Sequence, residues 1–163
     1  MRFLVLFVTV WMMVVVGCRK AEPPPPVDGG INFSIKDLDG RSVSFTEFRG
    51  KTVMLNIWAT WCKPCLHEIP DLKALHEELK SKDVVVLGVL LESGSAEEAR
   101  PMVVDQLKIN YPVWYGDDAF ARLFKVEAFP TTVIIDKNGK ALKMMLGAQS
   151  KERFLDALKS VGI

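Results

Sequence analysis

A nearly continuous apolar run leads directly into a segment with helical periodicity, and two cysteines lie at the junction. The run covers residues 52–58, and its composition is typical of a strand buried on both faces of a sheet. From residue 64 to 81 apolar side chains recur at three- and four-residue intervals, which predicts an amphipathic helix. Between them stands Trp61-Cys62-Lys63-Pro64-Cys65. The pattern therefore places a reversibly oxidisable dithiol at a helix N-terminus.

The rest of the domain alternates between strand and helix patterns. Asp39-Gly40 and Asn138-Gly139 are turn signals, each between two short strand patterns. We predict strands at 31–35, 42–45, 84–91, 111–114, 131–136 and 140–146, and helices at 96–107, 117–124 and 151–161, of which the first and last are capped by Ser95 and Ser150. This order predicts an α/β fold with a mixed central sheet flanked by helices and an N-terminal β-hairpin.

The N-terminus has the pattern of an export signal. Residues 3–16 are apolar apart from Thr9, and this stretch is shorter than the roughly 20 residues that span a bilayer. It ends in Val15-Val16-Gly17-Cys18, which resembles a bacterial lipoprotein signal. The resemblance implies a signal peptide at 1–17, lipidation of Cys18 and attachment to the membrane. The alternative is an uncleaved hydrophobic anchor in which Cys18 is incidental. Either interpretation places the domain outside the cytoplasm and tethered to a membrane, with the periplasmic side expected.

Residues 18–30 are predicted to be a spacer. They contain four consecutive prolines, Pro23 to Pro26, which favour an extended polyproline II conformation with no core of its own. The folded domain is then expected at 31–163.

Charge and cysteine content exclude several classes of function. Lys plus Arg is 21 and Asp plus Glu is 20, with no basic cluster, so we predict no nucleic-acid partner. A c-type haem motif needs a histidine directly after the second cysteine, where this chain has Leu66. A structural zinc site needs further spaced ligands, and the sequence has no second cysteine pair. We therefore predict no metal and no cofactor.

Several separated motifs resemble the TlpA/ResA-like thiol–disulfide oxidoreductases of bacterial envelopes, which have the thioredoxin fold. The matching stretches are residues 56–65, Glu68-Ile69-Pro70, Phe129-Pro130-Thr131-Thr132 and residues 135–140. The resemblance covers the chain from about residue 31 to its end. It implies a redox-active disulfide between Cys62 and Cys65.

The residues around the dithiol suggest distinct roles. Cys62, at the helix start, is the expected attacking thiol, because unpaired backbone N–H groups and the helix dipole stabilise a thiolate. Cys65 lies one turn later and is expected to resolve the mixed disulfide. Lys63 and Pro64 are expected to tune the pair, although an ordinary surface lysine is the alternative for Lys63. Trp61 is expected to line the substrate surface.

The resemblance implies further site residues. Pro130 corresponds to a cis-proline opposite the dithiol, and backbone at Phe129 would pair with an extended client chain. Glu92, at the end of a buried strand, would carry protons, unless it is a plain surface glutamate. Asn56 is expected to make structural hydrogen bonds. Glu68 fits the family pattern, with a plain charge on the helix surface as the alternative.

These features predict a membrane-tethered enzyme that exchanges disulfides with client proteins. The resemblance implies net reduction, with electrons from a membrane thiol–disulfide transporter and apocytochromes c as possible clients. Two alternatives remain open. The protein could be an envelope disulfide oxidant, which differs in redox poise, or a lipoprotein that binds clients and uses the dithiol as a redox sensor with little turnover.

Overall fold

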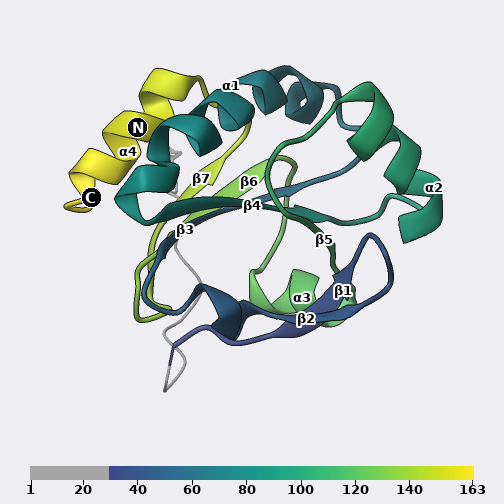
Figure 1. Cartoon of the computed structure of the whole chain (residues 1–163), viewed down its shortest axis with the longest axis horizontal. Helices are drawn as coiled ribbons and strands as arrows, with labels where there is room; N and C mark the ends of the chain where they lie inside the picture. The colour runs from purple at the N-terminus through teal and green to yellow at the C-terminus, as the bar shows by residue number, and fades with distance from the viewer. Residues whose placement is uncertain (1–29) are drawn as a thin grey trace, which may run out of the picture.

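A computed structural model describes residues 30–163 of the chain. These residues form a seven-stranded sheet in the order β2-β1-β5-β4-β3-β6-β7 (Figure 1). The strands are β1 (Ser34–Asp37), β2 (Ser42–Ser44), β3 (Thr52–Trp58), β4 (Val84–Leu90), β5 (Val113–Tyr115), β6 (Thr131–Ile135) and β7 (Ala141–Leu146). Because β3 pairs in parallel with β4 and antiparallel with β6, the sheet is mixed, as predicted.

Helices cover both faces of this sheet. In Figure 1, α1 (Lys63–Leu79), α2 (Ala96–Pro101) and α4 (Lys151–Ser160) lie on one face, and α3 (Asp118–Leu123) lies on the other. Short helical turns complete the elements: η1 (Phe45–Phe48), η2 (Lys80–Lys82) and the π-helical turn η3 (Met102–Gln106). Within residues 30–163, no helix is long and apolar enough to cross a bilayer.

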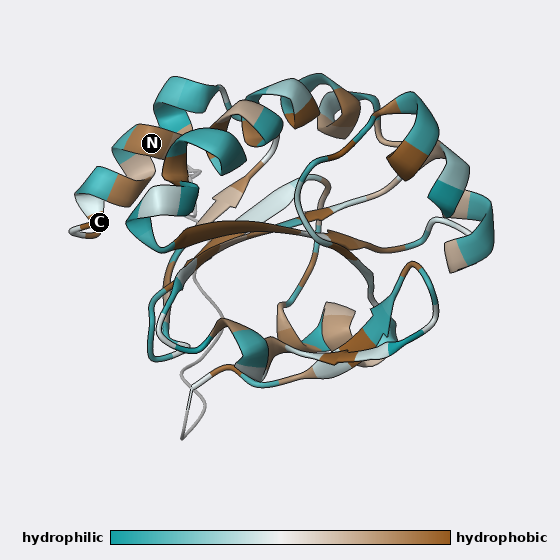
Figure 2. Ribbon diagram, in the orientation of Figure 1, coloured by the Kyte–Doolittle hydropathy of each residue, from teal (hydrophilic) through white to brown (hydrophobic). Residues whose placement is uncertain are grey.

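Each face of the sheet carries its own hydrophobic core, and β3 contributes to both. Met54 and Trp58 pack with α1 and α4, whereas Leu55 and Ile57 pack with the aromatic side chains of α3 and η1. Since successive side chains of a strand point to opposite faces, burial of β3 on both faces agrees with its place in the interior of the sheet. Figure 2 shows this hydrophobic band along the middle of the sheet.

Sheet topology brings three chain segments to one edge. Parallel pairing places the ends of β3 and β4 together, with Trp58 opposite Leu90. Antiparallel pairing of β3 with β6 then sets Ile57 opposite Thr131, so β6 begins at that same edge. The cysteine pair follows β3, Glu92 follows β4 and Pro130 precedes β6, so all three arrive at one site.

The structure differs from the sequence expectations in a few places. The first strand begins at Ser34, because Ile31 donates its backbone N–H to Gly139 of the β6–β7 turn (2.7 Å) instead. The helix expected over 96–107 is α-helical only to Pro101 and continues as a π-helical turn, with Leu107 donating to the carbonyl of Met102. Proline lacks the N–H that the regular ladder needs, which accounts for the change at this point.

The signal peptide at 1–17, the lipidation site Cys18 and the spacer at 18–30, apart from Gly30, lie outside the described residues.

Candidate active site

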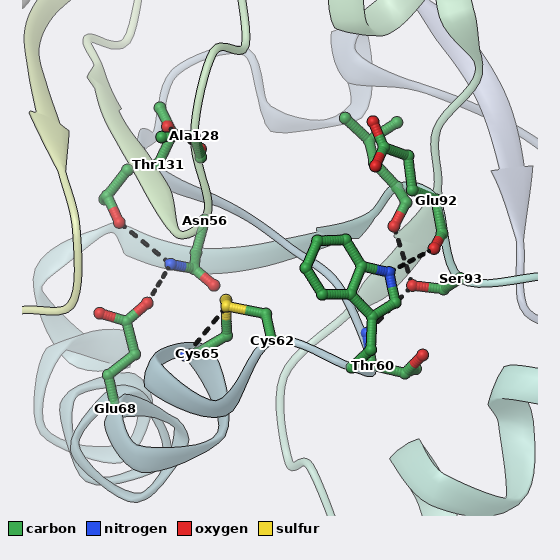
Figure 3. The surroundings of a disulfide bond; sticks show 12 residues. Asn56, Thr60, Cys62, Cys65, Glu68, Glu92, Ser93, Ala128 and Thr131 are labelled. Carbon is green, nitrogen blue, oxygen red and sulfur yellow. Dashed lines mark hydrogen bonds between the residues drawn. A yellow bond between two sulfur atoms is a disulfide. The ribbon is translucent and has the colours of Figure 1, made fainter.

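The dithiol stands at the first turn of α1, in its oxidised form. Cys62 and Cys65 are joined by a disulfide with an S–S distance of 2.03 Å. Cys62 is the N-cap of α1, and its Sγ accepts a hydrogen bond from the backbone N–H of Cys65 (3.3 Å) (Figure 3). Cys62 keeps 5% of its surface exposed and Cys65 none. The N-cap sulfur is thus the one that solvent and a client can reach.

The first turn of α1 also holds the two residues between the cysteines. Lys63 is exposed and Pro64 lies in the first helical turn, where a missing N–H leaves no helical hydrogen bond unmade. That the two residues tune the dithiol stays a prediction.

A cis peptide bond joins Phe129 to Pro130, as the resemblance implied. The segment before it forms one wall of a pocket of about 540 Å³ that Cys62 also lines. Trp61, 60% exposed, packs its indole edge-on against Phe129 with ring centroids 5.6 Å apart. The pocket therefore joins the reachable sulfur to an aromatic surface and to the start of β6. Its lining residues are Trp61, Cys62, Lys63, Pro64, Glu92 and residues 126–129.

Glu68 is buried beside the dithiol, which excludes the alternative of a plain charge on the helix surface. It is 2% exposed. One carboxylate oxygen accepts a hydrogen bond from Asn56 Nδ2 (2.8 Å), and the other accepts one from the backbone N–H of Gln149 (3.0 Å). Asn56 also donates to Thr132 Oγ1 (3.0 Å), which confirms its expected structural role. Figure 3 shows Asn56 and Glu68 on one side of the disulfide.

The sequence carried a signal for this burial. Glu68 follows Cys65 by three residues and precedes Leu72 by four, so it lies on the apolar face of α1 together with those two buried side chains. A carboxylate on that face needs partners from elsewhere in the fold, and the sequence does not show where they are.

Burial raises the pKa of the Glu68 carboxyl to about 7. The hydrogen bonds from Gln149 and Asn56 favour the ionised form and act against this rise, while the negative charge of Asp71 adds to it. A carboxyl group with a pKa near neutrality can take up or release a proton at physiological pH. It lies one helical turn from Cys65, on the same face of α1.

Glu92 lines the same pocket, but its carboxylate is exposed. Its backbone carbonyl accepts a hydrogen bond from Trp61 Nε1 (2.7 Å). A second pocket of about 760 Å³, between β1 and the start of α3, shares Glu92 as a wall. The residue therefore lies at the site, with its acid group in solvent and its carbonyl holding the tryptophan.

The described residues contain no group of three or more His, Cys, Asp or Glu side chains that could hold a metal ion. The site contains two sulfur atoms, one buried carboxyl group and a pocket beside them. These groups are suited to thiol–disulfide exchange.

Comparisons with known proteins agree with this chemistry. The AhpC/TSA family matches residues 28–143. Thiol-disulfide oxidoreductase ResA of Bacillus thuringiensis subsp. konkukian is 34% identical over 131 residues, which cover 80% of this chain and 75% of that protein.

Solved structures extend the comparison to the fold. A thiol:disulfide interchange protein from Chlorobium tepidum is 26% identical with a TM-score of 0.72, covering 88% of this chain and 99% of the other. The exposed lipoprotein thioredoxin of Streptococcus pneumoniae is 29% identical with a TM-score of 0.69, covering 80% and 99%. The chain belongs to the AhpC/TSA family and is a ResA-like thiol–disulfide oxidoreductase with a thioredoxin-like fold.

Proposed function

We propose that this protein reduces disulfides of client proteins through Cys62 and Cys65, with Cys62 as the attacking thiol. The observation that carries the proposal is the position of Cys62, which is the N-cap of α1 and also lines the pocket beside Phe129. A thiolate at that position accepts hydrogen bonds from backbone N–H groups and faces the positive end of the helix dipole. Cysteines in such positions have pKa values of roughly 3.5 to 7.5, against about 8.5 when free.

The exchange proceeds in two steps. The Cys62 thiolate attacks one sulfur of a client disulfide and forms a mixed disulfide, while the other client sulfur leaves as a thiolate. Cys65 then loses its proton and attacks Cys62 Sγ, which restores the Cys62–Cys65 disulfide and releases the second client thiolate. Two electrons pass from the dithiol to the client, and the two client thiolates take up protons.

Glu68 is our candidate for the group that takes the proton of Cys65. It shares a helix face with Cys65, and its pKa of about 7 lets it accept a proton when Cys65 attacks and release it afterwards. The carboxylate of Glu92 is exposed, so we assign proton transfer to Glu68 in its place.

Client chains are expected to bind in extended form along the pocket. Backbone beside Pro130 would pair with the client as an added strand, and Trp61 and Phe129 would contact the residues flanking its cysteine.

The location and partners that we propose rest on the N-terminal pattern and on the relatives. In this proposal residues 1–17 are a signal peptide, Cys18 carries a lipid and residues 18–30 are a spacer. Together they would hold the domain 31–163 at the outer face of a bacterial cytoplasmic membrane or further out in the envelope. The description of the Streptococcus pneumoniae relative as an exposed lipoprotein supports this arrangement. Electrons would come from a membrane thiol–disulfide transporter, and apocytochromes c are the proposed clients.

The central test is a trapping experiment. Cys65→Ser removes the resolving thiol, so we expect a stable mixed disulfide between Cys62 and a client, released by dithiothreitol and identified by mass spectrometry. Cys62→Ser is the matched control and should trap nothing. Equal trapping by both variants, or insulin reduction that survives Cys62→Ser, would contradict the assigned roles.

Three further measurements test the direction, the client and the tether. A glutathione redox titration should give a potential nearer the roughly −270 mV of thioredoxin than the roughly −120 mV of a strong oxidant. Cys62→Ser should lower holocytochrome c in a host that depends on this protein. Incorporation of labelled fatty acid should be lost in Cys18→Ser. A potential near the oxidising end, normal holocytochrome c, or labelling without Cys18 would each remove the corresponding part of the proposal.

A further inference from the structure

The segment that follows β4 is hydrogen-bonded to the loop that carries Cys62. We call residues 91–94 the latch segment and residues 59–62 the reactive loop. Thr60 donates its backbone N–H to Ser93 Oγ (3.0 Å), and Trp61 Nε1 donates to the carbonyl of Glu92 (2.7 Å). One residue earlier, Leu91 N–H donates to the carbonyl of Trp58 (3.0 Å). The latch segment thus continues the β3–β4 pairing beyond the end of the sheet.

The reactive loop is a tight turn whose two central residues are both fixed in this way. Cys62 N–H donates to the carbonyl of Ala59 (3.1 Å), which closes the turn around Thr60 and Trp61. Thr60 is held through its backbone and Trp61 through its indole. Because the turn ends at Cys62, the two bonds set the direction from which the chain enters α1. Figure 3 shows Glu92 and Ser93 on the side of the disulfide away from Glu68.

The Ser93 hydroxyl uses both of its hydrogen-bonding capacities. It accepts from Thr60 N–H and donates to the carbonyl of Leu91 (2.8 Å), and the residue is 8% exposed. Removing the hydroxyl would leave two backbone groups without this partner at a poorly hydrated place. Unpaired buried polar groups are costly, so the reactive loop would have to move until water can hydrogen-bond to these backbone groups.

The latch segment is itself anchored on its far side. Glu92 has a φ of +50°, in the left-handed region, and Tyr115 donates its hydroxyl hydrogen to the carbonyl of Gly94. The hydroxyl of Ser93 is therefore presented to Thr60 by a segment that is held at both ends.

We infer that Ser93 is a positioning residue for the dithiol, acting through Thr60 to keep Cys62 at the N-cap of α1. This inference rests on the proposed function, in which Cys62 is the attacking thiol. When the bond from Thr60 is lost, the reactive loop no longer fixes Cys62 Sγ beside the first N–H groups of the helix. The thiolate then loses part of its stabilisation, so Cys62 reacts more slowly at neutral pH.

The chain offers a matched control for the test. Ser95 lies two residues further on, and its hydroxyl also accepts a backbone N–H, that of Glu98 (3.2 Å), but it has no bond to the reactive loop. Ser93→Ala and Ser95→Ala each remove one hydroxyl from the same stretch of chain. Ser93→Thr keeps the hydroxyl and should restore wild-type behaviour.

The experiment measures alkylation of Cys62 in the reduced full chain, solubilised in a neutral detergent. Iodoacetamide is added between pH 5 and 9, and modification at position 62 is quantified by peptide mass spectrometry. We expect Ser93→Ala to slow alkylation at pH 7 by about three- to tenfold, which corresponds to the net contribution of one hydrogen bond, with the pH profile displaced upward. Insulin reduction should slow by a similar factor. Ser95→Ala should change neither.

The outcomes separate this inference from the proposed function. Wild-type Cys62 that fails to react at neutral pH would remove the proposed function itself. Reactive wild-type Cys62 combined with equal profiles for Ser93→Ala and Ser95→Ala would overturn the inference and leave the function standing. If Ser93→Ala does not fold, amide hydrogen exchange of wild-type protein decides. Thr60 N–H should be protected in the reduced form, and exchange at the rate of an exposed amide would overturn the inference.

Discussion

Glu68→Gln tests whether the buried carboxyl titrates near neutrality. Burial raises the pKa of Glu68 from its ordinary 4.5 to about 7. At about 1.4 kcal/mol per pKa unit, this difference corresponds to about 3 kcal/mol between the folded and unfolded states. Between pH 4.5 and 7 the folded protein holds a proton on Glu68 that the unfolded chain has lost. The free energy of unfolding should therefore fall as pH rises through this window, and Glu68→Gln should abolish the decrease.

Glutamine can replace the carboxylate of Glu68 because the side-chain oxygen of Asn56 is available as a hydrogen-bond acceptor. In the structure Asn56 Oδ1 has no hydrogen-bond partner, while its Nδ2 donates to Glu68 and Thr132. If the Asn56 amide turns over, Oδ1 accepts from the new amide at position 68 and from the Thr132 hydroxyl, and the glutamine oxygen still accepts from Gln149 N–H. Asn56 Nδ2 then takes the unpartnered place that Oδ1 has in the wild type, so one unpartnered polar atom replaces another. We therefore expect a variant that folds, with stability near wild type at pH 5 and higher by about 1–3 kcal/mol at pH 8.

The assay is urea unfolding of the oxidised full chain in detergent at several pH values, so that no thiol titrates. Glu77→Gln is the control on the same helix. Glu77 is exposed, and its hydrogen bond with Lys80 lowers its pKa, so it titrates below this window. Glu77→Gln should therefore show the same decrease in the free energy of unfolding with pH as the wild type. Parallel curves for wild type and Glu68→Gln between pH 5 and 8 would refute the reasoning, because Glu68 would then have the same protonation state in the folded and unfolded chain.

Two further changes extend the argument. Asn56→Ala removes a hydrogen bond that favours ionised Glu68, so the pKa of Glu68 should rise further. In the same unfolding assay, the pH-dependent loss of stability should then extend to higher pH. An unchanged pH profile would count against a role of this hydrogen bond. Trp61→Ala removes the exposed indole from one side of the pocket, so KM for a disulfide-containing peptide should rise by about three- to tenfold, as expected for a client contact worth about 0.5–1.5 kcal/mol. Loss of the Phe129 contact and of the hydrogen bond to the Glu92 carbonyl should also lower stability, and an unaltered KM would remove Trp61 from the client surface.

Local patterns were sufficient to predict most of the fold. The run at 52–58 and the periodic segment after it correspond to β3 and α1 within two residues, and Asn138-Gly139 lies between β6 and β7 as predicted. These elements are dictated by neighbours in the chain, through burial on two faces, helical spacing and turn chemistry. The π-helical turn after Pro101 was missed because the helical pattern was extended across a proline.

The parts of the site that could be predicted are those marked by a short sequence motif. The disulfide of Cys62 and Cys65 and the cis bond at Pro130 both follow from motif spacing and resemblance. The hydrogen-bond partners of Glu68 and the bond of Ser93 to Thr60 could not be predicted in this way. Glu68 is held by an amide 81 residues away, and Ser93 by a loop 33 residues away, so their surroundings depend on the completed fold.

The two cysteines of the dithiol lie beside polar groups of different chemical kinds. On the side of Cys65, the neighbouring polar network contains a carboxyl that changes protonation near pH 7. On the side of Cys62, the bonds that we describe join backbone groups, a serine hydroxyl and an indole, which keep their protons between pH 5 and 9. In the proposed mechanism, a change in pH within the neutral range would therefore act on Cys65 through Glu68, while the contacts that position Cys62 stay the same. The proposed steps of attack and resolution would then respond differently to pH, although the two cysteines are three residues apart.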